Sequence, residues 1–369
     1  MNIPLSAPDI TDAEIDAVTA VLRTNRLSLG PRLGEFESAF ARYIGTPYAI
    51  AVSSGTAGLH LCIRALNLGP GDEVVVPSFT FIAAANAIRY ERATPVFVDI
   101  DPVTLNATPA LIQAAITPRT RAILAVHTFG VPADMPAILA IARRHNLFVV
   151  EDACEAIGAS LHNQRVGSFG DAAVFAFYPN KQITTGEGGM VVTRNHALAE
   201  RIRALRNQGR YPSDDWLQHS ELGYNYRLSE LACALGLAQL DRIHAILAAR
   251  DAVARRYHER LANLPLALPP LDLPNTTISW FVYVVRLHER FSQQQRDALL
   301  RALTTHGIGC ARYFAPIHRQ PAYADWSAIH LPVTESVAAR TLALPFFNRL
   351  TAEQQNHICE TLAREISRL

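Results

Sequence analysis

The chain has 369 residues, of which 34 are lysine or arginine and 33 are aspartate or glutamate, so its formal net charge at pH 7 is +1. Near neutrality together with 49% apolar residues excludes a disordered chain and a strong electrostatic attraction to nucleic acid or an acidic membrane. Charged residues make up only 18% of the chain, against about 25% in typical globular proteins. We therefore expect part of the surface to be covered in a subunit interface.

The cysteines and the first residues of the chain indicate its compartment. Five cysteines are scattered without a CxxC spacing, and an odd number cannot pair completely within one chain, so we expect reduced thiols in a cytoplasmic protein. The opening residues MNIPL lack the basic and apolar regions of a signal peptide. The uncharged stretch between Arg42 and Arg64 is interrupted by small hydroxylated residues, so it is not expected to span a membrane.

Two helices are predicted at the start of the chain. Thr11 and Glu14 form a capping-box pattern ahead of apolar residues at helical spacing, which predicts an amphipathic helix over 12–23. A second helix is predicted over about 34–43, where Phe36 and Phe40 are one turn apart.

From there to about residue 152, short apolar runs alternate with helical stretches. The runs are 48–52, 73–76, 95–100, 122–126 and 147–151, and the helical stretches open near Gly55, Phe81, Thr108 and Asp134. This alternation predicts a mostly parallel sheet covered by helices on both faces. Two further runs, 172–177 and 190–193, extend the predicted sheet to seven strands.

After His196 the pattern becomes mainly helical. A long helix is predicted from Leu228 to about Leu261, because Gly236 is its only glycine or proline. A proline-rich joint at 264–270 follows, and then a strand over 279–287, a helix over 293–305 and a terminal helix from 351. We expect a large α/β domain over 1–245, with an N-terminal helical arm, and a smaller α+β domain over 246–369.

The segment SSGTAG (53–58) follows the first predicted strand and leads directly into a helix. Gly55 would let backbone N–H groups approach an anion, and Thr56 adds a hydroxyl at the helix amino terminus, so the segment fits a phosphate cradle. An ordinary helix-capping loop has the same appearance. The segment has neither the lysine of a P-loop nor the GxGxxG pattern of dinucleotide sites.

Aromatic and acidic residues stand at two further strand ends. Phe81, in PSFTF (77–81), could cover a flat ligand, and core packing is the alternative. Asp152 and Glu155 follow the run 147–151, where a carboxylate is costly to bury unless a cation meets it. A metal, an arginine or a protonated heterocycle could supply that charge. A metal is the least favoured, because HExxH, CxxC and EF-hand spacings are absent.

Lys181 lies between an apolar predicted strand and the glycine-rich segment TTGEGG (184–189). Lysines are usually solvated, but the flanking sequence here is of a buried type, which favours the neutral, nucleophilic amine. Such an amine forms a Schiff base with an aldehyde. An anion cradle, a stacking ring, a buried carboxylate and this lysine together match one ligand, pyridoxal 5′-phosphate (PLP).

Five motifs occur in order along the chain: SSGTA (53–57), PSFTF (77–81), EDACEA (151–156), FYPNK with TGEGG (177–189), and GYNYR (223–227). They resemble the motifs of the DegT/DnrJ/EryC1/StrS aminotransferases, which transaminate nucleotide-linked keto-sugars. The resemblance extends from residue 4 to about residue 345. It implies a fold-type-I PLP-dependent transferase, similar to aspartate aminotransferase, that works as a homodimer with two active sites at the subunit interface.

The resemblance also implies roles for individual residues. Lys181 would hold the cofactor aldehyde as a Schiff base and, once released, move a proton between substrate and cofactor. Asp152 would keep the pyridinium nitrogen protonated, and Phe81 would stack on the ring. Glu155 would lie near the phenolic oxygen, where many members have Gln or His, so a carboxylate there must be protonated or compensated.

The cofactor phosphate would be held by Gly55, Thr56 and Ala57, with help from the partner subunit's Asn225. Outside the resemblance, Asn225 is simply a polar turn residue. Ala176 stands where the family usually has a serine, so another donor must replace that hydroxyl.

Three further residues are expected near the cofactor or the sugar. Tyr178 belongs to the FYPNK motif, His127 ends the run 122–126, and His318 lies in the segment PIH (316–318). Either histidine, taken alone, is more often a structural residue with its hydrogen bonds satisfied.

We therefore predict a PLP-dependent aminotransferase that moves an amino group from L-glutamate, leaving 2-oxoglutarate, onto a nucleotide-linked 4-keto-6-deoxy sugar. The TTGEGG form resembles members that aminate carbon four; a 3-keto sugar or a keto-cyclitol is the alternative acceptor. A sugar dehydratase using PLP or pyridoxamine 5′-phosphate (PMP) would carry histidine in place of Lys181. A non-catalytic PLP-binding regulator would not need both Asp152 and Lys181.

Overall fold

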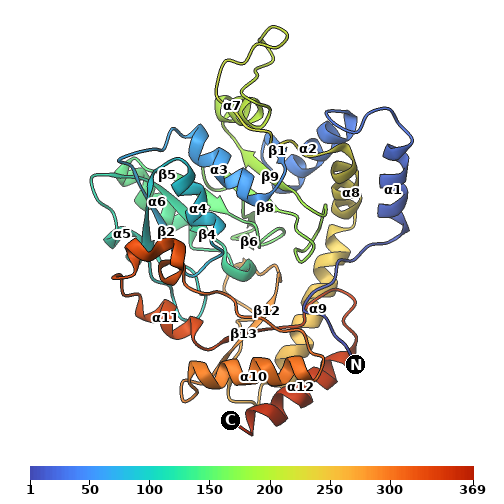
Figure 1. Cartoon of the computed structure of the whole chain (residues 1–369), viewed down its shortest axis with the longest axis vertical. Coiled ribbons are helices and arrows are strands. Elements are labelled where there is room, and N and C mark those ends of the chain that lie inside the picture. The colour runs from blue at the N-terminus through green and yellow to red at the C-terminus, as the bar shows by residue number, and fades with distance from the viewer.

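A seven-stranded sheet forms the centre of the structure (Figure 1), a computed structural model that describes residues 1–369. The strand order is β1-β9-β8-β5-β4-β2-β3. Only β9 runs antiparallel to its neighbours; the other adjacent pairs are parallel. The strands are β1 (Tyr48–Val52), β2 (Glu73–Pro77), β3 (Thr94–Val98), β4 (Thr120–Val126), β5 (Phe148–Asp152), β8 (Ala172–Ala176) and β9 (Gly189–Thr193). The predicted mostly parallel α/β sheet is confirmed.

Helices cover both faces of this sheet because its strands are apolar on both sides. One face packs against α3 (Gly55–Ala65), α4 (Ala83–Tyr90) and α7 (His196–Arg206). The other face packs against α2 (Pro31–Ile44) and the region of α8 (Glu230–Asp241) at the β1 end, and against α5 (Pro109–Ala114) and α6 (Met135–His145) at the β3 end. The carboxyl ends of the parallel strands are therefore left free to form a site.

The predicted continuous helix over 228–261 is wrong. It is divided into α8 and α9 (Ile243–Leu261), which meet at 66°, and the break falls at Arg242 rather than at Gly236. Arg242 forms ion pairs with Asp9 and with Glu14, at the start of α1 (Asp12–Leu22). These long-range contacts hold Arg242 in place between the two helices. No glycine or proline stands at the break, so the local sequence did not indicate it.

Helix α9 connects the large sheet to a second domain. Ile243 and Ile246 belong to the core beneath the large sheet, whereas Val253 and Tyr257 belong to the core of the second domain. That domain contains the antiparallel sheet β10-β12-β13 and the helices α10 and α12, at the bottom of Figure 1. Its elements are β10 (Leu266–Ala267), β12 (Tyr283–Leu287), α10 (Gln293–Thr305), α11 (Pro332–Ala338), β13 (Thr341–Leu344) and α12 (Ala352–Ile366).

Two details of the second domain differ from expectation. Ile3 packs in its core and pairs with Ile308, so the first residues of the N-terminal arm lie with this domain rather than with the large one. The predicted strand over 279–287 starts only at Tyr283. The guanidinium of Arg250 binds the carbonyls of Trp280 and Phe281, which removes these groups from strand pairing.

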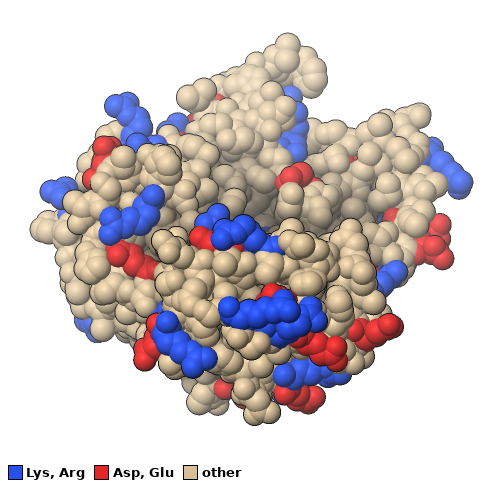
Figure 2. Space-filling model, turned by 60° about the horizontal axis from the view of Figure 1, so that its bottom comes forward, with Lys and Arg blue, Asp and Glu red and all other residues tan.

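A third, small sheet joins β6 (Ser160–Leu161), β7 (Gln164–Arg165) and β11 (Thr276–Thr277). No helix by itself has the length and apolar character of a membrane span; α8 and α9 meet that test only in combination, across their bend. Figure 2 shows basic and acidic side chains interspersed over one face, with much uncharged surface between them. On this face, side chains of the two signs lie interspersed, as expected for a chain of near-zero net charge.

Candidate active site

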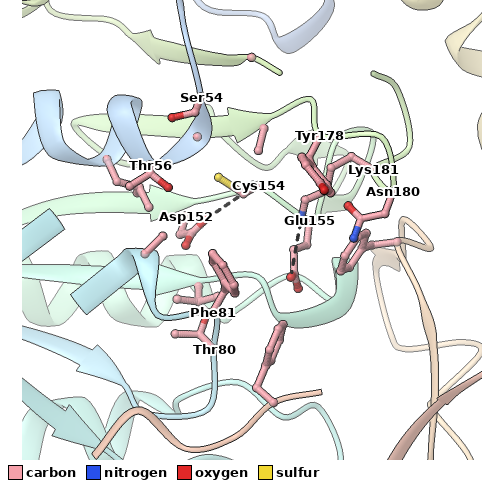
Figure 3. A pocket seen from close by; sticks show the side chains of 18 of the residues that line it. Ser54, Thr56, Thr80, Phe81, Asp152, Cys154, Glu155, Tyr178, Asn180 and Lys181 are labelled. Carbon is pink, nitrogen blue, oxygen red and sulfur yellow. Dashed lines mark hydrogen bonds and ion pairs between the residues drawn. The ribbon is translucent and has the colours of Figure 1, made fainter. Parts of the chain in front are cut away.

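A cavity of about 310 Å³ lies where the ends of β5 and β8 meet the amino terminus of α3 (Figure 3). Parallel strands bring their carboxyl ends to one edge of a sheet, so segments distant in sequence meet there. The lining brings together most of the residues that the sequence singled out: Gly55, Thr56, Phe81, Asp152, Glu155, Tyr178 and Lys181.

The amino terminus of α3 forms one end of the cavity. Ser54 is the N-cap residue, and its hydroxyl accepts the N–H of Ala57 at 3.0 Å. The preceding N–H groups of the first turn have no partner within the helix, which makes this end suited to an anion. A Cβ added at Gly55 would lie 2.7 Å from the Cβ of Ala176 and 2.9 Å from the Sγ of Cys154, so this position has no room for a side chain.

We expect Gly55→Ala to weaken phosphate-ester binding at least tenfold and to cost about 1–3 kcal/mol of stability, since overpacking forces backbone shifts. Cofactor titration and thermal unfolding measure the two effects. Gly34→Ala is the matched control, because Gly34 lies in α2 with no atom within 4 Å of an added Cβ. Unchanged cofactor affinity in Gly55→Ala would contradict the expected phosphate-binding role of this helix end.

Lys181 is held by the closed loop between β8 and β9. The N–H of Phe177 donates to Gly188 and that of Thr185 donates back to Phe177, while the N–H of Lys181 donates to Tyr178 at 2.9 Å. This tight turn directs the lysine side chain into the cavity, where 13% of its area is exposed. Its Nζ lies 3.8 Å from the centroid of the Phe281 ring.

One feature of the sequence further supports Lys181 as the candidate nucleophile. Lys181 is the only lysine in the chain; all the other basic residues among the 34 are arginine. An arginine guanidinium stays protonated and cannot act as an amine nucleophile. The single side-chain amine of the protein thus lies in its candidate active site, a signal that a count of lysines alone would have found.

Two carboxylates face the cavity, one at the end of β5 and one shortly beyond it. Asp152 is 7% exposed, and its Oδ1 accepts the N–H of Cys154 at 3.1 Å. Glu155 is also 7% exposed; its Oε2 accepts the N–H of Phe129 at 2.9 Å, and its Oε1 lies 3.7 Å from the Nζ of Lys181. Burial raises the pKa of the Glu155 carboxyl, against the lowering effect of the Lys181 charge.

Cys154, between the two carboxylates, also lines the cavity. Burial raises the pKa of its thiol well above the ordinary value, and the neighbouring Asp152 carboxylate raises it further. A thiol in this state is neutral and a poor nucleophile. Lys181 is therefore the stronger candidate nucleophile.

Aromatic rings enclose the rest of the cavity. Phe81 and Tyr178 come from the large domain and are 59% and 50% exposed. Phe281, Tyr313 and Phe314 come from the second domain. Sequence reasoning missed these three residues, because nothing local distinguishes them from core aromatics and only the packing of the domains brings them to the site.

The structure does not bring His127 and His318 to the cavity. Both side chains are 0% exposed. The Nε2 of His127 lies 3.1 Å from a carboxylate oxygen of Glu151, and its Nδ1 accepts the N–H of Ala133. The nitrogens of His318 lie 2.7 Å from the Ser78 hydroxyl and 3.1 Å from a Glu335 carboxylate oxygen. Both nitrogens of each ring are engaged by buried partners and neither residue lines the cavity, so the structure does not support the expected contacts of these histidines with cofactor or sugar.

Two of the residues expected at the phosphate are absent from the cavity lining. The N–H of Ala57 is engaged by the N-cap Ser54 and is not offered to a ligand. Asn225 is exposed on the surface of the same chain, next to the stacked rings of Tyr224 and Tyr226. In this chain its side chain does not line the cavity.

The fold and this cavity define an α/β enzyme whose candidate nucleophile is a lysine facing buried carboxylates. Residues 8–363 match the model of the DegT/DnrJ/EryC1/StrS aminotransferase family. The chain belongs to this family, and it is an aminotransferase.

Named relatives agree with that assignment. The chain is 43% identical over 364 residues to GDP-perosamine synthase of Caulobacter vibrioides, covering 98% of this chain and 97% of that protein. It is 38% identical to DesV of S. venezuelae, with a TM-score of 0.91 and coverage of 100% and 99%. It is 28% identical to Spr1654 of Streptococcus pneumoniae in its PLP form, with a TM-score of 0.94 and coverage of 100% and 99%.

Proposed function

We propose that this sugar aminotransferase uses PLP to transfer an amino group from L-glutamate to carbon four of a nucleotide-linked 4-keto-6-deoxy sugar. The observation that carries the proposal is the position of the only lysine, in a cavity formed by a helix amino terminus, an aromatic ring and two buried carboxylates. Bound PLP supplies an aldehyde that takes up the amino group and a ring that withdraws electrons.

The residues present fit this cofactor. The free N–H groups at the start of α3 suit a phosphate, and the hydroxyls of Ser54 and Thr56 can take the place of the one missing at Ala176. The Oδ1 of Asn180 is buried in the lining without a hydrogen-bond partner, which leaves an acceptor for a ligand donor.

We assign a separate role to each of the chain's own residues. Lys181 would hold the cofactor through its aldehyde and, when free, would take and return a proton at its Nζ. Asp152 would keep the ring nitrogen in its protonated form. Phe81 and the aromatic residues of the second domain limit access of water to the reacting atoms.

We also propose a homodimer in which the partner subunit's Asn225 completes each phosphate site. On the present chain, the Nδ1 of His60 lies 3.2 Å from the Tyr226 hydroxyl, and the N–H of Ser53 donates to the Tyr226 carbonyl. These contacts tie the Asn225 segment to the middle of α3 and to the residue two positions before that helix, while leaving Asn225 exposed. The low charged fraction of the chain supports a covered surface of this kind.

The nature of the acceptor is supported by two observations. The 43% identical relative is named for a GDP-linked sugar, and the TTGEGG form of the lysine loop resembles members that aminate carbon four. A 3-keto nucleotide sugar and a keto-cyclitol are the alternative acceptors. The lysine at position 181 argues against a dehydratase, and its presence with Asp152 argues against a non-catalytic regulator.

A half-reaction panel tests this substrate. L-Glutamate should convert the enzyme to its colourless PMP form, and nucleotide-linked 4-keto-6-deoxy sugars, GDP-linked ones first, should restore the visible absorption within seconds to minutes. A 3-keto isomer and a keto-cyclitol are the comparison acceptors. Restoration by one of these alone would refute carbon-four amination, and no response to L-glutamate would refute the donor.

A further inference from the structure

Two loop segments supply aromatic walls to the cavity. Phe81 lines it from the loop after β2 (Figure 3), and Tyr313 and Phe314 line it from the second domain. No backbone N–H of residues 79–81 or 312–315 donates a hydrogen bond to another backbone group. Local backbone bonding therefore fixes neither segment, and the position of each wall depends on the residues that anchor it.

The two segments share one buried anchor, formed by Ser78 and His318. The Ser78 carbonyl accepts the Ile317 N–H at 3.0 Å, and the Ser78 Oγ accepts the His318 N–H at 3.2 Å. The same Oγ lies 2.7 Å from the His318 Nδ1, and both residues are 0% exposed. This anchor lies three residues before Phe81 and four residues after Phe314, so it links the two walls over a short length of chain.

The hydrogen-bond pattern assigns the protons of the His318 ring. The Ser78 Oγ accepts the His318 N–H, and its own hydrogen has no acceptor other than Nδ1, which is therefore unprotonated. The Nε2 then carries the ring hydrogen and donates it to the Glu335 Oε1 at 3.1 Å. Although burial acts to raise the pKa of Glu335, its hydrogen bonds hold that pKa at about 2, so the acceptor is a carboxylate.

The surroundings of His318 favour its neutral ring near pH 7. Burial, the largest influence, lowers the pKa of His318, and the Arg319 charge lowers it further. The carboxylates of Glu335 and Asp99 act in the opposite direction without reversing the shift. His330 lies 3.2 Å from the other Glu335 oxygen but is exposed. A proton gained at Nδ1 at lower pH would remove the only acceptor of the Ser78 hydroxyl.

We propose that His318 is a positioning residue: its neutral ring, bonded to Ser78 and Glu335, holds the two aromatic walls at the spacing that the cofactor ring and the sugar require. His318 does not line the cavity and acts through Ser78. The inference rests on the proposed function, in which Phe81 covers the cofactor ring. It predicts that the Ser78 bond, rather than the volume of the imidazole, matters for the reaction.

Two substitutions of His318 form a matched pair for testing this role. An asparagine amide can replace the Nδ1 side of the ring and keep the Ser78 bond, whereas a glutamine amide can replace the Nε2 side and keep only the Glu335 bond. The rate constant of the half-reaction with L-glutamate should fall roughly 10- to 100-fold in His318→Gln and in Ser78→Ala, because small displacements of positioning groups are costly. It should fall less than about threefold in His318→Asn.

Visible circular dichroism of bound PLP supplies a readout that does not need turnover. The band reports how the cofactor ring is oriented, so it should weaken in His318→Gln and Ser78→Ala and stay near the wild type in His318→Asn. Thermal unfolding verifies that each variant is folded. As the pH falls through the lowered pKa of His318, the wild type should lose rate, and His318→Asn should not show this loss because it has no ring to protonate.

Wild-type rates and dichroism in His318→Gln and Ser78→Ala would overturn the proposal. Equal losses in His318→Asn and His318→Gln would overturn it as well, because they would indicate packing of the ring rather than the Ser78 bond. If the dichroism follows the expected order but the wild type does not react with L-glutamate, the proposed amino donor fails, whereas the positioning of the cofactor by His318 is supported.

Discussion

Replacing Lys181 by alanine is expected to abolish turnover while leaving a folded protein that still binds PLP. The variant loses both the amine that bonds to the aldehyde and the group that moves the proton, and proton transfer alone contributes roughly 100- to 10,000-fold to a rate. The remaining contacts at the α3 amino terminus and Asp152 are untouched. The buried Glu155 carboxyl loses its charged partner and is expected to become protonated rather than remain an unpaired charge.

Because the chain contains no other lysine, the side chain to which the cofactor attaches can be identified without ambiguity. Borohydride treatment of the wild type with PLP should attach the cofactor to one internal peptide, that containing Lys181, and mass spectrometry should find none attached to a side chain in Lys181→Ala. Lys181→Arg keeps the positive charge but offers no nucleophilic amine, so it should be equally inactive. Substantial turnover by either variant would contradict the role assigned to Lys181.

Replacing Asp152 by asparagine is expected to lower the rate roughly 10- to 1,000-fold. An opposite charge within hydrogen-bonding range shifts the pKa of an ionisable group by about 1–3 units, and each unit corresponds to a factor of ten. Asparagine retains an oxygen that can accept the Cys154 N–H, so the backbone turn should persist. The loss should therefore appear in the rate constants of both half-reactions rather than in stability.

Stopped-flow half-reactions and thermal unfolding separate these two effects. Asp16→Asn is the matched control, because Asp16 is an exposed carboxylate on α1, far along the chain from the cavity residues. A wild-type rate in Asp152→Asn would show that the ring nitrogen does not need this carboxylate. An unstable Asp152→Asn with normal rate constants per folded molecule would indicate a structural role instead.

The sequence predicted the local elements well where a single signal dominates. The strand 48–52 and the helix 293–305 have the bounds that periodicity and capping gave. The helix over 228–261 failed because its break depends on ion pairs between Arg242 and the N-terminal residues Asp9 and Glu14. A contact more than two hundred positions away along the chain leaves no trace in the local pattern.

The candidate site, like the fold, was predictable from the sequence only in part. Lys181, Asp152, Glu155 and the Gly55 segment lie at strand ends or a few residues beyond them, so a strand-end rule locates them, and the sheet topology brings them together. His127 satisfied the same rule and still lies outside the cavity, because its ring is engaged by buried partners. Position at a strand end does not determine the direction of a side chain.

The sequence by itself determined the class of chemistry, since one lysine, two acidic residues and a small hydroxylated segment at strand ends suffice to indicate a Schiff-base enzyme with a phosphate-bearing cofactor. Only the tertiary structure decided which groups lie against one another in the cavity. The 3.7 Å approach of Glu155 to Lys181 and the closure by Phe281 depend on the packing of two domains joined through α9. Electrostatic coupling depends on distance and burial, and neither quantity is encoded in local residue order.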